Sequence, residues 1–454
     1  MKIRCFSLRA FSGFFLAVFL ASGSVAAPFD AAWIKGVTDK SPVTYHLDET
    51  IRFTLTVEGV NGKFPNEGYF LEWKRTGDDG LEDKGRHALS DRPFVYETKI
   101  GCPGFVRLFA VIVDKDGNRV NRVAKKGPTT VSFDGGAGVD ISMLKEPAEP
   151  KDFDSFWEKQ FSRLDLVPVE AERKEVKSPS DKVRVYAVSI ACAGLRPVTG
   201  YLSIPKAAET GAKFPCLLLT HGYDGDNFAH PAPQQINAGR VVLDINAHGL
   251  KLPAFGATEA DRKALRWECR SNGCSYAFDG KQNEDPETAY FNGMILRVKR
   301  ALQYLKTLPE WNGRDLYAEG GSQGGLQTIW AAGCGEGVTR VYASIVWCCD
   351  ICTNASRKVP VMHRDGWGDG WYISWTEAMG YYDAVNFAKR IPPTCRVDIP
   401  RAGLGDYCCP PMGLAKLWNA LRTSKRITWV QGSEHGYVPP KYEGRDFVFE
   451  EDAR

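Results

Sequence analysis

The sequence has almost no excess of charge of either sign. It contains 58 basic and 55 acidic residues, and the three basic residues of the first 27 positions, where there is no acid, account for the whole difference. A chain without net charge offers no electrostatic attraction to nucleic acid or to an anionic membrane surface. With 43% hydrophobic and 25% charged residues among 454, the composition is that of a globular protein with room for two or three domains.

Long hydrophobic runs are also missing. A membrane-spanning helix needs about 20 apolar residues, and no run of that length is present. The apolar stretch from Ala10 to Leu20 is shorter, and it stands between basic residues and the small residues Ser24 to Ala27. That pattern is typical of a secretory signal peptide. We therefore expect residues 1–27 to be removed and the mature protein to be exported to the periplasm or the extracellular space.

The sequence lacks a set of ligands with the spacing of a metal site. The cluster Cys348-Cys349-x-x-Cys352 has no second CxxC pair or histidine pair that would complete a zinc site. Cysteines are nevertheless frequent after residue 27. In an oxidising compartment they predict structural disulfides or buried thiols, with a connectivity that spacing alone does not give. We expect neither a metal nor a cofactor.

Alternating apolar residues mark the first part of the chain. Phe53, Leu55 and Val57 alternate with polar residues, which is the two-residue period of a half-buried strand. Three similar runs follow between turn signals: Tyr69 to Trp73, Phe94 to Ile100 and Phe105 to Val113. We predict a small antiparallel β-sandwich over residues 28–140, of the immunoglobulin or fibronectin kind.

The pattern changes after a segment that we interpret as a linker, made of the glycine-rich residues 135–138 and the stretch from Pro147 to Pro150. Beyond it, short continuous apolar runs are each followed by a glycine-containing loop: Pro215 to Leu219, Val241 to Leu243, Leu316 to Ala318, Val341 to Val346 and Ile427 to Val430. The segment from Thr288 to Leu308 carries apolar residues at three- and four-residue steps, as a helix does. Buried strands alternating with helices predict an α/β domain with a mostly parallel sheet over residues 147–454.

One junction between a strand and a helix carries a serine in a distinctive turn. Residues 320–325 read GGSQGG, with an apolar run before them and apolar residues at helical spacing after them. Strand, G-x-S-x-G and helix in this order form the nucleophile elbow of the α/β-hydrolase fold. Gly320 and Gly324 fit because the neighbouring strand and helix leave no room for a Cβ. The alternative is a glycine-rich turn with an incidental serine, but both flanking elements favour a nucleophile at Ser322.

A serine hydroxyl needs a base, and in this fold the chain order is Ser, then Asp or Glu, then His. Two histidines follow Ser322. We predict His435 as the base because it directly follows an apolar run, and we interpret His363 as a surface or space-filling residue. Asp406, in the sequence GLGDYCCPP, is the predicted carboxylate that orients His435. Three other acids fit less well: Asp350, Asp383 and Asp398.

Acyl transfer also needs hydrogen-bond donors for the oxyanion that forms. One predicted donor is the backbone NH of Gln323, the residue after the nucleophile. The second is the backbone NH of Tyr223, in the loop after the apolar run that ends at Leu219. His221, in the same loop, is interpreted as a structural residue.

The motifs of the second region occur in four segments: Asp152 to Trp157, Gly321 to Gly325, Tyr382 to Ala388 and Asp406 to Pro411. Together these segments resemble the acetyl xylan esterase and cephalosporin C deacetylase family of carbohydrate esterases, in the α/β-hydrolase superfamily. The resemblance implies metal-free hydrolysis of acetyl esters on sugars or on polysaccharides such as xylan. It also implies a triad and oxyanion donors at the matching positions: Ser322, Asp406, His435, Tyr223 and Gln323.

Within the region of resemblance, about residues 147–440, the chain departs from the family at two positions. Residues 244–250, DINAHGL, stand where the family has an Arg-Gly-Gln motif. Gly436 stands where the family usually has a glutamate after its catalytic histidine. The Arg-Gly-Gln motif supports the active-site architecture rather than supplying the nucleophile, so the predicted chemistry does not depend on it.

Two other functions are compatible with parts of the sequence. A serine peptidase of the prolyl oligopeptidase type shares the elbow, but the first region is far smaller than a propeller and has no blade-length repeat. A non-enzymatic scaffold could bind polysaccharide through the sandwich aromatics Trp33, Tyr69 and Trp73, but the complete order of Ser, Asp and His favours an active enzyme. Aromatic residues in strands more often belong to the core, which favours a structural or lid role for the sandwich.

Overall fold

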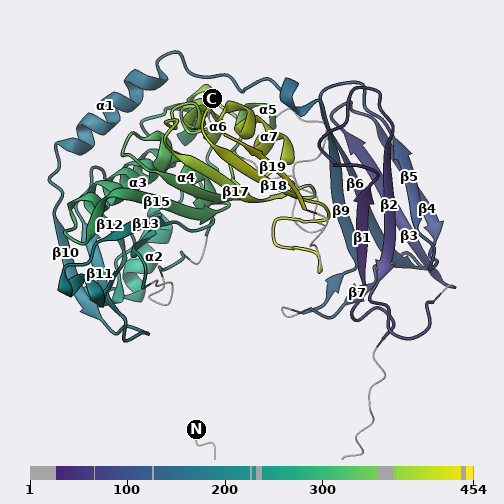
Figure 1. The fold of residues 1–454 in the computed structure, drawn as a ribbon, viewed down its shortest axis with the longest axis horizontal. Coiled ribbons are helices and arrows are strands. Elements are labelled where there is room, and N and C mark those ends of the chain that lie inside the picture. Colours follow the sequence, from purple (N-terminus) through teal and green to yellow (C-terminus); the bar gives the residue numbers. More distant parts are fainter. Residues whose placement is uncertain are drawn as a thin grey trace, which may run out of the picture.

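The structure is a computed structural model of the chain. It describes residues 27–452 apart from residues 66, 125–126, 225–227, 232–237, 355–372, 374 and 441–445. Residues 1–26 of the expected signal peptide lie outside the described residues, and so does His363. Two regions with separate sheets lie side by side (Figure 1).

The first region consists of two antiparallel sheets over one core. One sheet has the order β1-β2-β5 and the other the order β4-β3-β6-β9. The strands are β1 (Trp33–Thr38), β2 (Ile51–Glu58), β3 (Tyr69–Gly77), β4 (Glu82–Ala88), β5 (Phe94–Thr98), β6 (Gly104–Asp114), β9 (Ser132–Val139) and the short pair β7 (Asn121–Arg122) and β8 (Thr129–Thr130). Ile34, Phe53, Val106 and Phe133 from both sheets are buried together. The small all-β region predicted from the alternating pattern is confirmed.

The glycine-rich residues 135–138 belong to strand β9, so their interpretation as a linker is wrong. β9 pairs antiparallel with β6 from Ser132 to Val139. A Cβ on Gly136 would lie 2.6 Å from the carbonyl oxygen of Val106 and 3.3 Å from that of Leu404. Glycine here allows two backbones to approach closely, and a glycine run in a sequence does not distinguish this need from flexibility.

The aromatic residues considered as a sugar-binding platform pack inside the first region. Trp33 is buried. The ring centroids of Trp73 and Tyr96 are 4.5 Å apart, and those of Tyr69 and Phe29 are 4.9 Å apart. These contacts favour a structural role for the sandwich over carbohydrate binding by these three residues.

The second region contains one ten-stranded sheet with the order β10-β11-β12-β14-β13-β15-β16-β17-β18-β19. From β14 to β18 in this order, neighbouring strands run parallel, whereas the pairs at both ends are antiparallel. The strands are β10 (Ala171–Val176), β11 (Val183–Ile190), β12 (Val198–Pro205), β13 (Phe214–Leu219), β14 (Val241–Asn246), β15 (Trp311–Gly321), β16 (Arg340–Ser344), β17 (Arg396–Gly403), β18 (Lys425–Val430) and β19 (Asp446–Glu451). The predicted mostly parallel sheet is confirmed.

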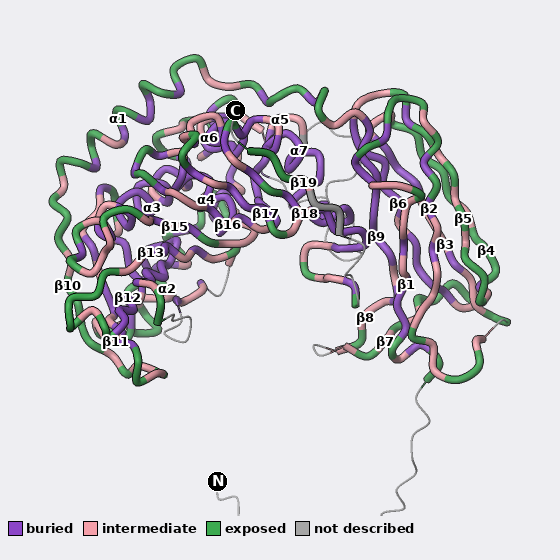
Figure 2. Tube along the Cα trace, viewed as in Figure 1, coloured by how far each residue is buried: buried purple, intermediate pink, exposed green. Residues whose placement is uncertain are grey.

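Helices cover this sheet (Figure 1). They are α1 (Phe153–Asp165), α2 (Glu259–Glu268), α3 (Tyr290–Thr307), α4 (Gln323–Gly333), α5 (Ile351–Asn354), α6 (Ala384–Ala388) and α7 (Pro411–Ala420). α3 falls where the periodicity predicts a helix. α4 is buried over its whole length from Gln323 to Ala332, which places it in the interior that Figure 2 colours as buried. An apolar helix of this kind holds the turn before it in a rigid frame.

The sandwich contacts the edge of the large sheet near the end of β18. Gln431, the residue after β18, accepts a hydrogen bond from the backbone NH of Gly136 at 2.9 Å and donates one to the carbonyl oxygen of Gly136 at 2.8 Å. The ring centroids of Phe105 and Trp429 are 6.1 Å apart. The two regions are therefore joined by packed and hydrogen-bonded groups, in addition to the connecting chain.

Most cysteines of the second region are thiols in the interior. Seven are buried and outside any disulfide: Cys216, Cys269, Cys334, Cys348, Cys349, Cys395 and Cys409. Of the two alternatives expected from the sequence, disulfides or buried thiols, these seven residues follow the second. Burial suits them because a thiol behaves as a small apolar side chain.

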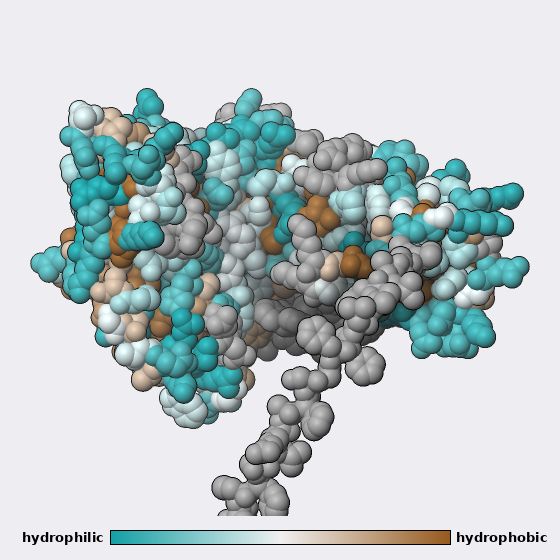
Figure 3. Space-filling model, turned by 90° about the horizontal axis from the view of Figure 1, so that it is seen from below, coloured by the Kyte–Doolittle hydropathy of each residue, from teal (hydrophilic) through white to brown (hydrophobic). Residues whose placement is uncertain are grey.

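Seen from below, the described part of the surface is largely hydrophilic, with hydrophobic residues only in small separate patches (Figure 3). Large exposed apolar side chains such as Leu166, Leu195 and Trp267 belong to different parts of the chain. No helix within the described ranges has the length and hydropathy of a membrane span.

Candidate active site

Ser322 lies on a strained turn between β15 and α4. Its backbone has φ 58° and ψ −121°, a conformation that residues with a side chain rarely adopt. The turn is held from both sides, because the Ser322 NH donates to the carbonyl oxygen of Ser344 at 3.0 Å and the Ser322 carbonyl accepts from Trp347 NH at 3.2 Å. This is the geometry of a nucleophile elbow.

Two glycines make the turn possible. A Cβ on Gly320 would lie 2.4 Å from Thr220 Oγ1 and 2.6 Å from the carbonyl carbon of Gly324, and one on Gly324 would lie 2.7 Å from the carbonyl oxygen of Thr220. The Thr220 hydroxyl also donates to the Gly324 carbonyl at 2.8 Å. The expectation that neither glycine has room for a Cβ is confirmed.

Asp406 and His435 meet across two loops at the carboxyl ends of β17 and β18. His435 Nδ1 and Asp406 Oδ2 are 3.0 Å apart. The other carboxylate oxygen, Oδ1, accepts hydrogen bonds from the backbone NH groups of Cys408 at 3.1 Å and Cys409 at 2.9 Å. Asp406 is fully buried, whereas 34% of the His435 side chain is exposed. The carboxylate is thus held rigidly, and the imidazole is partly accessible to solvent.

The electrostatics of this pair favour a protonated imidazole. Burial lowers the pKa of His435, but the hydrogen bond to Asp406 and the negative charge of Asp406 raise it more, so the net shift is upward from 6.5. A histidine of this kind can take up a proton and share it with a carboxylate that has a fixed orientation. That is the behaviour required of a general base in acyl transfer.

The sheet brings Ser322 to the same edge as this pair. β15, β16, β17 and β18 run parallel in adjacent positions, and Gly321 pairs with Ser344 while Gly403 pairs with Val430. Ser322, Asp406 and His435 each follow the carboxyl end of one of these strands. Parallel sheets place ligand and catalytic groups at this edge.

The loop after β13 passes beside the elbow. A Cβ on Gly222 would lie 3.9 Å from Ser322 Cβ, so the backbone next to Tyr223 borders the serine. Gln323 is the first residue of α4, where backbone NH groups have no acceptor within the helix. Two predicted donors, the NH groups of Tyr223 and Gln323, therefore belong to segments that flank Ser322.

Sequence reasoning missed Tyr276, which ties these segments together. Its hydroxyl donates to Gln323 Oε1 at 2.8 Å and accepts from Asp224 NH at 3.1 Å, and its ring stacks on Tyr223 at 4.3 Å. Tyr223 in turn donates its hydroxyl to the Tyr276 carbonyl at 3.2 Å. Tyr276 comes from an irregular segment between α2 and α3, where no periodic pattern or motif gives a signal.

The segment that replaces the Arg-Gly-Gln motif is buried and hydrogen-bonded within itself. Asp244 contacts the His221 imidazole, which fits the structural role expected for His221. The Asn246 side chain accepts from the backbone NH of His248 at 2.8 Å, and His248 Nδ1 lies 2.8 Å from the Tyr290 hydroxyl. In this chain, the loop that leads to Tyr223 is therefore held by the contact between Asp244 of this segment and His221 of the loop.

The other acids considered for the orienting role have partners of their own. Asp350 pairs with Lys416 at 2.7 Å, and Asp398 pairs with Arg340 at 2.8 Å. Asp383 caps α6 and accepts hydrogen bonds from backbone NH groups, including that of Ile351 at 2.7 Å. Burial and the neighbouring charge of Asp350 raise the pKa of Asp383 to about 7.

The sandwich touches the loop that carries Asp406. Arg107 of β6 forms a buried ion pair with Asp134 of β9, and its guanidinium lies 4.1 Å from the centroid of the Tyr407 ring. The loop approaches β9 so closely that a Cβ on Gly405 would lie 2.0 Å from the carbonyl oxygen of Asp134. Strands β6 and β9 of the sandwich therefore pack directly against the loop that carries Asp406.

We expect the substitution Gly405→Ala to damage both stability and turnover. The added methyl has no flexible neighbour to displace, so β9 and the loop must separate, at a cost of about 1–3 kcal/mol in the free energy of unfolding. Displacement of Asp406 is expected to reduce kcat about 10- to 100-fold. Gly436→Ala is the matched control, because a Cβ there would meet nothing within 4 Å. Equal denaturant midpoints and equal kcat for the two variants would contradict this role of the sandwich.

The fold and the elbow define the class of this protein, which is an α/β-hydrolase. Residues 143–360, slightly less than half of the chain, match the model of the acetyl xylan esterase (AXE1) family. The resemblance found in the sequence is thus confirmed.

Individual relatives agree with this match. The chain is 28% identical over 305 residues to the acetyl esterase Axe7A of Xylanibacter ruminicola, a match that spans 66% of each protein, slightly less than two thirds. The solved acetyl xylan esterase from Paenibacillus sp. R4 is similar with a TM-score of 0.52 at 21% identity, over 67% of this chain and 95% of that one. Acetyl xylan esterase 1 from Thermoanaerobacterium sp. JW/SL YS485 gives a TM-score of 0.53 at 20% identity, over 67% and 94%. At these identities the two solved structures show the shared fold.

Proposed function

We propose that this protein is an exported serine esterase that removes acetyl groups from acetylated sugars or from polysaccharides such as xylan. The observation that carries the proposal is the hydrogen bond between Asp406 and His435, at the sheet edge where Ser322 occupies a nucleophile elbow. The names of the similar proteins support an acetyl ester as substrate. Residues 28–140 are proposed to be a supporting domain and residues 147–454 the catalytic domain.

In the proposed mechanism Ser322 Oγ attacks the carbonyl carbon of the acetyl ester while His435 accepts its proton. Asp406 keeps the imidazole in the tautomer with hydrogen on Nδ1 and stabilises the imidazolium that forms. His435 then donates the proton to the departing sugar hydroxyl, which leaves an acetyl-enzyme. Water activated by His435 attacks the acetyl group, and acetate leaves as Ser322 regains its proton.

The oxyanion formed in both steps is proposed to be bound by the backbone NH groups of Tyr223 and Gln323. Such donors act on the charge that develops in the transition state, and one of them is commonly worth about 10²- to 10³-fold in kcat. The hydrogen bonds of Tyr276 to Gln323 and Asp224 support the proposal, because they fix the two segments relative to each other. The proposed chemistry needs no cofactor.

The pH dependence of activity tests the role of His435. The imidazole must be neutral to accept the serine proton, so kcat/KM is expected to fall as pH decreases through the pKa of His435. Because Asp406 raises this pKa above 6.5, the midpoint of the acid limb is expected above 6.5. A profile that stays flat from about pH 8 to about pH 5.5 would exclude His435 as the base.

Acetate release from acetylated xylan, from other acetylated glycans and from small acetyl sugars tests the reaction and the substrate together. The expected result is acetate from at least one acetylated carbohydrate and no cleavage of a dipeptidyl anilide. Cleavage of the anilide without acetate release would favour the prolyl oligopeptidase alternative. Export is tested separately. The protein is isolated from outside the cytoplasm, and its measured mass is compared with the mass calculated for a chain that lacks residues 1–27.

A further inference from the structure

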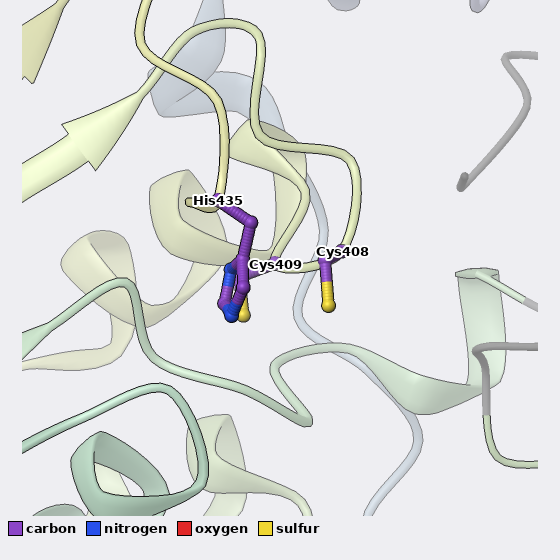
Figure 4. A group of neighbouring side chains, drawn as sticks. All are labelled: Cys408, Cys409 and His435. Atoms are coloured by element: carbon purple, nitrogen blue, oxygen red, sulfur yellow. The ribbon is translucent and has the colours of Figure 1, made fainter. Parts of the chain in front are cut away.

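Two adjacent cysteines lie against the imidazole of His435. Cys408 Sγ, Cys409 Sγ and a ring nitrogen of His435 all lie within 4.8 Å of one another. Figure 4 shows the three side chains pointing to the same side of two neighbouring loops, one before α7 and one after β18. Within the ranges that the structure describes, this is the group of histidine, cysteine and acidic side chains whose geometry suits a metal ion.

The backbone holds the two thiols in place. The NH groups of Cys408 and Cys409 both donate to Asp406 Oδ1, at 3.1 and 2.9 Å. Pro410 and Pro411 follow directly, and α7 begins at Pro411. Since proline restricts the backbone on both sides of its own bond, the orientation of the cysteine pair is largely determined before any ligand arrives.

The donor set is one that thiophilic divalent cations prefer. Zinc is bound by thiolates at about 2.3 Å and by imidazole at about 2.0–2.1 Å, commonly with four ligands in a tetrahedron. Ligand atoms around such an ion are about 3.5–3.8 Å apart. Donors within 4.8 Å of one another therefore need to approach by about 1.3 Å at most, which small side-chain rotations provide.

The imidazole of His435 has one ring nitrogen that Asp406 does not engage. His435 Nδ1 is directed to Asp406, which leaves Nε2 for an ion, and a carboxylate behind a histidine is the usual support of a metal-binding imidazole. Cys408 and His435 are both partly exposed, so an ion can enter from solvent. Cys409 is buried and closes the inner side of the group.

We propose that Cys408, Cys409 and His435 form a binding site for a thiophilic divalent cation such as Zn²⁺ or Cd²⁺, and that occupation of this site inhibits the enzyme. Both thiols release their protons to solvent when they bind the ion, and the fourth position is left to water. The ion takes the Nε2 electron pair that would otherwise accept the Ser322 proton. The inhibitory effect rests on the proposed function, whereas the binding itself does not.

The test is a titration of the reduced, chelator-treated full-length protein with Cd²⁺. Binding is monitored through the ultraviolet absorption of the cadmium–thiolate bonds that form. We expect one Cd²⁺ per chain at this site, with affinity at least about tenfold weaker in Cys408→Ser and in His435→Asn. Cys192→Ser, which alters a partly exposed thiol after β11, is the control and should bind like the parent. Absence of thiolate absorption, or unchanged affinity in both site variants, would overturn the proposal.

A second measurement, inhibition of ester hydrolysis by the metal, distinguishes failure of the metal-site proposal from failure of the proposed function. Hydrolysis of a small acetyl ester is measured with increasing Zn²⁺ or Cd²⁺, and each variant is compared with its own metal-free rate. The parent and Cys192→Ser are expected to lose activity at the concentrations at which the site fills, and Cys408→Ser only at concentrations at least about tenfold higher. A parent without esterase activity would contradict the proposed function, and the absorption titration would still decide the site. Binding without inhibition would show that the ion does not occupy Nε2.

Discussion

Replacement of Ser322 by alanine is expected to lower kcat for acetyl ester hydrolysis by about 10⁶-fold while the protein stays folded. The variant lacks the only atom that forms the acyl bond in the proposed mechanism, and the remaining groups cannot substitute for it. The small loss of side chain leaves the hydrogen bonds of the turn intact, because Ser344 and Trp347 make them with the backbone of residue 322. Steady-state kinetics and thermal unfolding measure the two effects.

The matched control is Ser344→Ala, which removes a hydroxyl from the end of the adjacent strand but keeps the carbonyl that accepts the Ser322 NH. It is expected to stay active. If Ser322→Ala hydrolysed acetyl esters at the parent rate, the nucleophile would have to be sought elsewhere. If it failed to fold, the elbow would owe its stability to the serine side chain, contrary to the backbone contacts seen here.

Replacement of Asp406 by asparagine is expected to lower kcat by about 10⁴-fold with little change in shape. An asparagine can still accept the NH groups of Cys408 and Cys409, but with its NH₂ toward His435 it stabilises the wrong imidazole tautomer. Loss of the negative charge also removes the cause that raises the pKa of His435. The acid limb of the residual activity is therefore expected to move to lower pH.

This shift of the pH profile distinguishes an orienting carboxylate from one that merely stabilises the loop. Asp398→Asn is the control, since Asp398 forms ion pairs with Arg340 and Arg396 at the start of β17. That variant should retain kcat and an unchanged profile. An Asp406→Asn enzyme with parental kcat, or with an unmoved acid limb, would exclude the proposed role of Asp406.

The local parts of the site could be read from the sequence because their causes are local. A strand-like run, GGSQGG and a helical pattern specify a turn whose geometry needs glycine at residues 320 and 324, and the structure contains that turn. The pairing of Asp406 with His435 was accessible through chain order and the two preceding strands, and the two side chains are hydrogen-bonded. Their chemical roles stay predictions that the variants above test.

The parts that sequence reasoning missed depend on contacts between distant segments. Tyr276 bonds to Gln323, 47 positions away, and Gly136 bonds to Gln431, 295 positions away. Neither contact leaves a periodic pattern. The same limitation explains the wrong interpretation of residues 135–138, since close packing and flexibility select the same amino acid.

The sequence by itself determined the class of fold, the elbow and the order of candidate catalytic residues, because strand, helix and turn preferences act between near neighbours. The tertiary structure alone decided that the sandwich packs against the Asp406 loop, that Tyr276 joins the segments flanking Ser322, and that two thiols lie against His435. These arrangements arise when the large sheet aligns the ends of its parallel strands. The residues in these contacts come together only after the intervening chain has folded, so their spacing in the sequence does not predict the contacts.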